Sequence, residues 1–343
     1  MLAGALAAFG LPSPAWAGAA GTDRDLELER TAVIVEHDYV DLPELGPGGA
    51  MGLNLLDEPG YSVANQRLGD VYVRAGIVLE RPALIERGFD AFDHAFSRQR
   101  RDGSFPDAEQ AEEYAFFIEA VAHSILLLRE AGLAEAYQRR LSRYVDRLEE
   151  ALPFVLNDRR WADFRYRNRF YTHSAYVMGS ALTLLGELTG GKRVKRYGRD
   201  AVEMGLSRQR PSGVNPELGG YDVRYHMTGL VYAGRFAVHF PSLALAARVG
   251  RMVERGLGWM GKRIGDSGWI DWPGSTRACR EISAVTGLPK TPGYDFAVRG
   301  FAYWGEHTGS EELVLEAQAA HAYAAQATRL CAAEQVFPAP DPP

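Results

Sequence analysis

Ser97-Arg98-Gln99-Arg100-Arg101-Asp102-Gly103 recurs 110 positions later as Ser207-Arg208-Gln209-Arg210-Pro211-Ser212-Gly213. Each copy follows a segment whose apolar residues are three or four positions apart, which is the spacing of one face of an α-helix. Half of this offset, about 55 residues, falls on Leu152-Pro153 and on Lys262, where two other helical patterns end. A repeat of this length fits a hairpin made of two helices and their loops.

Helical spacing extends over most of the chain. The segments with this pattern are residues 67–79, 82–98, 107–130, 134–154, 173–188, 194–208, 223–240, 243–264, 296–306 and 311–333. Alternation typical of strands is scarce, and its best example runs from Val33 to Val40. The pattern predicts an all-α fold, an (α/α) toroid or incomplete barrel in which about six helical hairpins close around a central cleft. An open α-solenoid is the alternative.

The composition is that of an ordinary globular protein. Of the 343 residues, 46% are hydrophobic and 24% are charged. The 38 basic residues are outnumbered by 44 acidic ones, which argues against a nucleic-acid partner. Beyond the first residues there is no apolar run of about 18 residues, so we expect no membrane anchor. No linker divides the chain, and residues 18–343 are predicted to form a single domain and a monomer.

The first 17 residues are uncharged and end in Ala15-Trp16-Ala17, a small-x-small pattern typical of signal-peptide cleavage. We expect residues 1–17 to be a signal peptide and the protein to be periplasmic or secreted; a disordered or expression-derived tail is the alternative. The two cysteines, Cys279 and Cys331, pair in such a compartment or remain buried free thiols. If they pair, they tie the loop after Trp272 to the C-terminal helix.

Aromatic residues stand beside carboxylates in three segments between helical patterns: Asp102-Gly103-Ser104-Phe105, Trp161-Ala162-Asp163-Phe164 and Gly268-Trp269-Ile270-Asp271-Trp272. Exposed rings with polar neighbours can stack on the C–H faces of sugars. The alternative is that these rings plug the ends of a helical barrel.

Two polar segments lead into helical patterns. Residues 167–176 (RNRFYTHSAY) bring His173 to a helix start, and residues 216–226 (PELGGYDVRYH) bring Tyr225 and His226 to another. His173 and Tyr225 are 52 positions apart, close to one hairpin period. In a toroid they would therefore occupy equivalent ends of adjacent inner helices and face the same cleft. With arginines near both, the pair favours a functional site over two structural side chains.

Three features follow one another along the chain: Asn-x-x-x-x-His ending at His173, Pro-Glu-Leu at 216–218, and the pair Tyr225-His226. This order resembles the α/α-toroid polysaccharide lyases, in particular the alginate lyases and the related alginate and glucuronan lyases. The resemblance that these features carry extends roughly from Arg98 to Phe240. In the alginate lyases the first motif is typically Asn-Asn-His-Ser-Tyr, and His173-Ser174-Ala175-Tyr176 stands in that place. The resemblance implies a catalytic domain that cleaves an anionic polysaccharide, a polyuronate such as alginate, polymannuronate or glucuronan, by β-elimination.

Such a lyase removes the weakly acidic C5 proton beside a uronate carboxylate and expels the 4-O-linked sugar. Cationic or amide groups neutralise the carboxylate, and a tyrosine or histidine transfers protons. The resemblance implies that Tyr225 is the principal acid/base and that His173 is a neutraliser or second base. The substrate-binding candidates are Asn168, Arg169, Arg224, Arg210, Tyr221, His226 and Trp269. His226 points about 100° away from Tyr225 on a helix, so packing is also expected for it.

Charge on the substrate predicts that Arg167, Arg169, Arg210 and Arg224 gather at one mouth of the cleft, although the protein as a whole is net negative. No metal or other cofactor is required, because the eight histidines are scattered and His94 and His123 lie on apolar helical faces. A calcium site made of loop carboxylates near Asp266 and Asp271 stays open as an alternative, although no known calcium-binding motif is present there.

Two other classes of function remain open. Toroids of this size also host glycoside hydrolases, which use paired carboxylates. The candidate carboxylates for such a reaction are Asp102, Asp107, Glu113, Asp222, Asp266 and Asp271. The third class is a periplasmic glycan-binding protein without catalysis, in which Tyr225 would serve only as a stacking ring.

Overall fold

Helices joined by turns and irregular loops make up the chain in the computed structural model, which describes residues 24–36, 42, 44–55, 61–106, 108, 110–282, 289–326 and 330–331. The expected signal peptide lies outside these residues. Within them the fold is all-α, as predicted, and the β-bridges are isolated pairs. No described helix is long and apolar enough to cross a membrane.

The α-helices are α2 (Arg24–Glu36), α3 (Gly69–Val78), α4 (Pro82–Arg98), α5 (Ala111–Glu130), α6 (Gln138–Ala151), α7 (Pro153–Leu156), α8 (Asp158–Arg167), α9 (Thr172–Thr189), α10 (Lys192–Leu206), α11 (Val223–His239), α12 (Ala244–Gly261), α13 (Tyr294–Thr308) and α14 (Glu311–Gln326). Short 3₁₀ helices are η1 (Pro47–Gly49), η2 (Gly52–Leu55), η3 (Val63–Leu68) and η4 (Asn168–Phe170).

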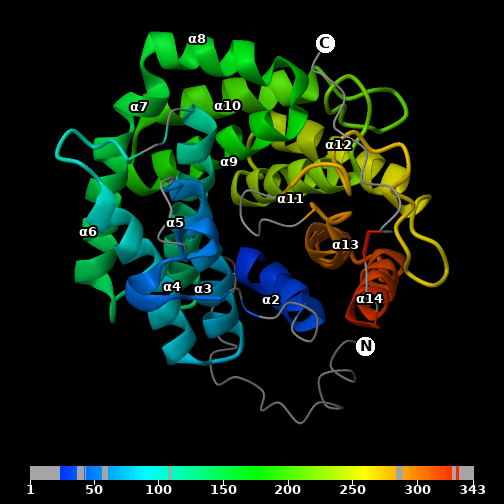
Figure 1. Ribbon diagram of the computed structural model, residues 1–343, viewed down its shortest axis with the longest axis horizontal. Helices are drawn as coiled ribbons and strands as arrows, with labels where there is room; N and C mark the ends of the chain where they lie inside the picture. Colours follow the sequence, from blue (N-terminus) through cyan, green and yellow to red (C-terminus); the bar gives the residue numbers. More distant parts are fainter. Residues whose placement is uncertain are drawn as a thin grey trace.

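The longer helices form an inner ring and an outer layer (Figure 1). Around the ring, α3, α5, α9, α11 and α13 each pack on the next, and α2 packs between α13 and α3 and closes the circle. Each of the six ring helices except α2 also packs on the outer helix that follows it in the chain: α4, α6, α10, α12 and α14. About six hairpins were predicted; the described residues hold five, plus the single helix α2.

Burial separates the two layers. The inner helix α9 is buried continuously from Thr172 to Gly186, because neighbours cover it on every side. The outer helix α6 buries only one stripe, which includes Leu141, Tyr144 and Leu148, and leaves its charged face in solvent. The core therefore lies between the layers.

The repeated Ser-Arg-Gln-Arg segments form the same turn twice. The amide of Gln99 donates to the carbonyl of Gly103 (3.0 Å), and the amide of Gln209 donates to the carbonyl of Gly213 (2.9 Å); each also donates to a carbonyl of the next outer helix at 2.9 Å. Both glycines have positive φ, 88° and 95°, and a Cβ there would lie 1.9 or 2.3 Å from a carbonyl oxygen of that helix. Only glycine fits. A third such turn occurs at Gly268, against α14.

Two local predictions were wrong. Val33, taken as the start of a strand, lies within α2, because that helix buries Leu26, Leu28 and Ala32 in the ring and this packing outweighs the β-branched run. Residues 37–40 lie outside the described part. Trp161 to Phe164, taken as a loop, belongs to α8, whose N-cap Asn157 accepts a hydrogen bond from the backbone N–H of Arg160 at 2.8 Å.

Long and short connections alternate along the chain. Those from an inner helix to its outer partner are short, for example residues 190–191 between α9 and α10 and residues 309–310 between α13 and α14. Those from an outer helix to the next inner helix are long: 99–110, 152–171, 207–222 and 262–293. Because α3, α5, α9, α11 and α13 run in the same direction, the described parts of the long connections share one rim. The N-terminal ends of α5, α9, α11 and α13 lie at that rim.

Candidate active site

A cleft of about 1570 Å³ opens at this rim. Its walls come from the first turns of the inner helices, represented by Asp70 on α3, Glu112 on α5, His173 on α9, Tyr225 on α11 and Asp295 on α13. Among the described residues, eight arginine and lysine side chains line it, against six carboxylates. The cations are Arg67, Arg167, Arg169, Arg224, Arg235, Arg277, Lys290 and Arg299. A net-negative protein thus concentrates positive charge in its cleft.

His173 is held in the wall by the loop before α11. Its Nδ1 and its backbone N–H both meet Oε1 of Glu217, at 3.0 and 2.9 Å. Its Nε2 lies 3.4 Å from Oε1 of Glu112 on α5. The neighbouring Thr172 hydroxyl donates to the Pro216 carbonyl at 2.6 Å and joins the two sequence motifs directly.

Two carboxylates keep His173 protonated. Burial alone would lower the pKa of the imidazole, but the charge of Glu217 and the hydrogen bonds with Glu112 and Glu217 raise it to about 10. At neutral pH the ring is therefore an imidazolium. Of the two roles considered, neutraliser or second base, this favours the neutraliser, because an imidazolium has no lone pair to accept a proton.

Tyr225 lies against His173 in the cleft, with their ring centroids 4.4 Å apart. Its hydroxyl receives a hydrogen bond from Nζ of Lys290 at 2.6 Å, and the guanidinium of Arg277 lies over its ring, 3.8 Å from the centroid. Three cationic groups thus surround one phenol. The cleft therefore places positive charge on several sides of a hydroxyl group that is able to transfer a proton.

Arg277 and Lys290 belong to a single loop that several bonds hold against α11. Asp222, the N-cap of α11, accepts from the backbone N–H of Tyr225 (3.0 Å) with one carboxylate oxygen. With the other it accepts from the backbone N–H of Arg277 (2.7 Å) and of Ala278 (2.6 Å). One aspartate therefore positions both the helix end that carries Tyr225 and the loop that carries Arg277.

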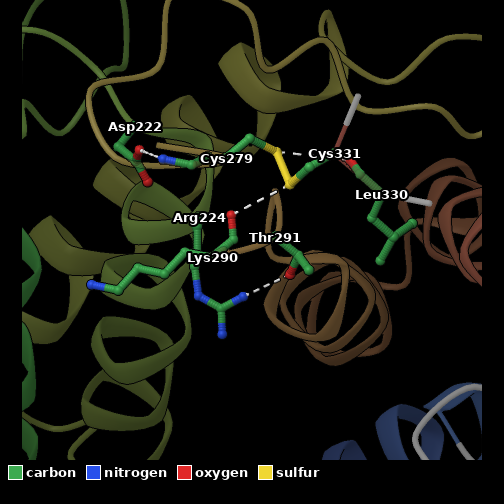
Figure 2. The surroundings of a disulfide bond; sticks show 8 residues. Asp222, Arg224, Cys279, Lys290, Thr291, Leu330 and Cys331 are labelled. Atoms are coloured by element: carbon green, nitrogen blue, oxygen red, sulfur yellow. Dashed lines mark hydrogen bonds between the residues drawn. A yellow bond between two sulfur atoms is a disulfide. The ribbon is translucent and has the colours of Figure 1, made fainter. Parts of the chain in front are cut away.

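A disulfide between Cys279 and Cys331 fixes the same loop (Figure 2). This resolves the alternative left open by the sequence in favour of pairing. The Cys279 N–H donates to the carbonyl of Lys290 at 2.6 Å. The disulfide therefore also holds the backbone at Lys290, whose side chain reaches Tyr225. The disulfide supports the site as well as the fold.

Replacing both cysteines by serine is expected to lower the free energy of unfolding by about 2 to 4 kcal/mol, because the bridge closes a loop with a sequence separation of 52 residues. Chemical denaturation of the wild type and of the Cys279→Ser/Cys331→Ser variant measures the difference. A reductant serves as the control, since it should destabilise the wild type and leave the double variant unchanged. Equal stability with and without reductant in the wild type would contradict the prediction.

Three further substrate-binding candidates line the cleft with Tyr225 and His173: Asn168, Arg169 and Arg224. Asn168 donates to the Phe164 carbonyl at 3.1 Å, Arg169 lies over the ring of Tyr166, and Arg224 is 3.5 Å from Asp295. Arg167 also lines the cleft, and its Nε meets Asp163 at 2.9 Å.

Four predicted substrate-binding residues are not among the described residues that line this cleft: Arg210, Tyr221, His226 and Trp269. Arg210 donates to the Gly219 carbonyl at 2.7 Å and so does not join the other arginines. Tyr221 donates to the Pro273 carbonyl, and the side chain of Trp269 is exposed. His226 is fully buried; burial lowers its pKa to about 4, so it is neutral and packed.

The carboxylates proposed for a hydrolase do not come together either. Of the six, only Glu113 is among the described residues that line the cleft. Asp222 is the helix cap described above, Asp271 pairs with Arg263 at 3.1 Å, and Asp102 accepts from Ser104 in its own turn. Asp266 is exposed, and Asp107 lies outside the described residues. The aromatic segments mainly plug the barrel end: Phe105 and Trp272 are buried.

Sequence reasoning missed four residues around the central pair: Glu112, Glu217, Arg277 and Lys290. Glu217 lies inside the quoted Pro-Glu-Leu motif, so a signal for it existed. Glu112 stands in the first turn of α5, where acidic residues are common because they complement the helix dipole, so its position gave no signal of a site. Arg277 and Lys290 flank Cys279 in an irregular loop, where no periodicity indicates which way a side chain points.

Comparisons with known proteins find similarity in structure and none in sequence. No family model matches the chain, and no curated protein resembles it in sequence. Among solved structures, one named a polysaccharide lyase aligns over 90% of this chain and 90% of its own, with 12% identity and a TM-score of 0.48. Another, a protein from Actinoplanes, aligns over 89% of this chain and 81% of its own, with 14% identity and a TM-score of 0.44.

Proposed function

We propose that the protein is a polysaccharide lyase that cleaves a polyuronate by β-elimination. The observation that carries this proposal is the contact of Tyr225 with an imidazolium, His173, inside a cleft lined by cations. The pair supplies the two groups that the reaction needs: a proton-transfer group and a positive charge for the uronate carboxylate.

In this mechanism the substrate carboxylate lies against His173, with Asn168 and the arginines of the cleft close by. Spreading its charge onto these groups stabilises the enolate-like intermediate and makes the C5 proton acidic enough to remove. The Tyr225 phenolate takes that proton. The electron pair of the C5–H bond forms the C4=C5 double bond, the C4–O bond breaks, and the leaving oxygen receives a proton from Tyr225.

The architecture favours an anionic substrate for a second reason. Helices α5, α9, α11 and α13 all begin at the rim, so the positive ends of their dipoles face the cleft. Together with the excess of cationic side chains, this attracts a polymer that carries one carboxylate per sugar. Export to the periplasm or beyond is part of the proposal, and the disulfide fits an oxidising compartment.

The test is a panel of alginate, polymannuronate and glucuronan, each incubated with the purified protein. Elimination creates a conjugated C4=C5 double bond, which absorbs in the ultraviolet and appears together with each new reducing end. Reducing ends without the absorbance would indicate a hydrolase. Binding without either signal would indicate a glycan-binding protein, and both outcomes would refute the proposal.

The ionisation of His173 predicts how stability depends on pH. Its pKa rises from 6.5 to about 10 on folding, so the stabilisation from its ion pairs is complete below pH 6.5 and is lost as the pH rises through about 10. The difference in unfolding free energy between the wild type and His173→Gln should therefore shrink across that range.

Denaturation at a series of pH values measures this difference. His94→Gln is the control, because burial lowers the pKa of His94 below 6.5 and its contribution should stay constant above that pH. A His173→Gln difference that stays constant from pH 7 to 10 would mean that His173 is already neutral in the folded protein.

A further inference from the structure

Beneath the cleft, at the other end of the inner ring, three side chains from three helices converge. Asp25 on α2, His123 on α5 and His239 on α11 each offer a ligand atom, and these atoms lie within 4.8 Å of one another. Tyr225 and His239 are 14 residues apart on α11, so this cluster is roughly 21 Å from the catalytic pair. The mechanism proposed above uses none of it.

We propose that Asp25, His123 and His239 bind a zinc ion that locks helix α2 into the ring. This inference is independent of the reaction that the cleft performs. Imidazole nitrogen and carboxylate oxygen are typical zinc ligands, whereas calcium and magnesium prefer sites made of oxygen alone.

The spacing of the ligand atoms is close to that of a zinc site. Both imidazoles present Nε2 to the same oxygen, Oδ2 of Asp25, at 3.1 Å from His123 and 2.9 Å from His239. Ligands of tetrahedral zinc at bond lengths of about 2.0–2.1 Å stand roughly 3.3 Å apart. Small shifts of the two rings therefore admit the ion, and Oε1 of Glu29, 3.6 Å from Nε2 of His123, lies near the fourth position.

Outer partners already hold these ligands in a metal-binding orientation. Nδ1 of His123 meets Oδ1 of Asp70 at 3.0 Å, the carboxylate–histidine pairing that commonly supports zinc. The second oxygen of Asp25 accepts from the hydroxyl of Tyr303 at 2.5 Å. Asp70 lines the cleft above, which gives an ion a route from solvent.

The charge balance also calls for a cation. Four carboxylates are buried together here, those of Asp25, Glu29, Asp70 and Glu119, and two buried arginines, Arg74 and Arg235, pair with them. Two negative charges remain for His123 and His239 to balance. One divalent ion on neutral imidazoles supplies that charge and also coordinates the groups.

Zinc would have a specific structural task. Among the described helices, α2 has no outer helix of its own, unlike the other members of the ring, and it shares α14 with α13. Its ligand Asp25 would be joined through the ion to α5 and α11, the two helices that pack on either side of α9 in the ring.

The experiment uses the full chain, stripped with a chelator and titrated with zinc chloride by calorimetry, with metal content measured after dialysis. We expect one zinc per chain, and a rise in melting temperature when zinc is added. His239→Gln changes the most exposed of the three ligands. Loss of an outer partner of a ligand weakens metal binding by about 10- to 100-fold, and loss of His239 itself should weaken zinc binding by more than that. His94→Gln, on a histidine outside the cluster, should bind as the wild type does.

Cobalt substitution in the wild type keeps the proposal testable if the variant folds poorly. Tetrahedral coordination by nitrogen and oxygen should give visible d–d absorption, which zinc then displaces. Failure of the stripped wild type to bind zinc would overturn the proposal, and the cluster would be a network of protonated histidines. Zinc binding that survives both His239→Gln and Asp25→Asn would overturn it equally, because the ion would then lie elsewhere.

Discussion

Tyr225→Phe is expected to lower the turnover of a uronate polymer by about 10²-fold or more, while the Michaelis constant changes little. The substitution removes the hydroxyl that Lys290 contacts at 2.6 Å and keeps the ring that packs on His173 and Arg277. Only the proton-transfer group is lost. An effect on kcat rather than on KM is what the loss of an interaction made in the transition state produces.

Initial rates of double-bond formation measure this effect. Tyr197→Phe is the matched control, because Tyr197 lies on the outer helix α10 beside Trp161, and should retain wild-type kinetics. The melting temperature of Tyr225→Phe should be recorded alongside, to show that the variant is folded. If it forms unsaturated product at a near-normal rate, Tyr225 is not the acid/base.

The fold could largely be predicted because its signals are local. Apolar spacing marks each helix, and the Gln99 and Gln209 turns recur because every hairpin must bridge to the next outer helix in the same way. The exceptions are segments whose burial depends on distant partners. Helix α2 is stabilised by ion pairs of Glu29 with Arg74 and Arg235, far away in the chain, so its own residues did not reveal it.

Only the site residues whose positions follow from the repeat of the hairpins could be predicted from the sequence. His173 and Tyr225 start adjacent inner helices, and a period near 55 residues brings them together. Lys290 and Arg277 reach the same point through a disulfide-bonded loop, whose path follows from tertiary contacts with Asp222 and Cys331 rather than from spacing. The histidine cluster could not be predicted for the same reason. His123 and His239 are distant in sequence, and the closure of the helical ring brings them together.

Arg235→Met is expected to lower the free energy of unfolding by about 3 to 5 kcal/mol, the cost of breaking a buried ion pair from one side. The guanidinium is 2% exposed and donates to Glu119 at 2.9 Å and to Glu29 at 3.0 Å. Burial alone would lower the pKa of Arg235. The charges of Glu119, Glu29 and Asp70 outweigh this effect and hold the pKa well above its usual value. Methionine fills much of the same volume but leaves both glutamates buried without this counter-charge.

Chemical denaturation of Arg235→Met and of Arg248→Met measures the contrast. Arg248 forms an exposed ion pair with Glu203, and its loss should cost less than about 1 kcal/mol. Arg235→Lys keeps the charge without the fork of donors, so it should fall between the two and remain measurable if Arg235→Met does not fold.

The pH dependence of the Arg235→Met deficit identifies its cause. Burial raises the pKa of Glu29, but Arg74 and Arg235 outweigh it and hold the pKa below 4.5 in the folded wild type. The stability that Glu29 contributes is present above pH 4.5 and is lost as the pH falls through the folded pKa. In Arg235→Met, Glu29 loses one of the two charges that lower its pKa and protonates more readily, so the deficit should shrink as the solution is acidified. A deficit independent of pH would instead assign the lost stability to packing of the aliphatic part of the arginine. A loss of unfolding free energy no greater than that of Arg248→Met would mean that the buried charges do not hold the ring together.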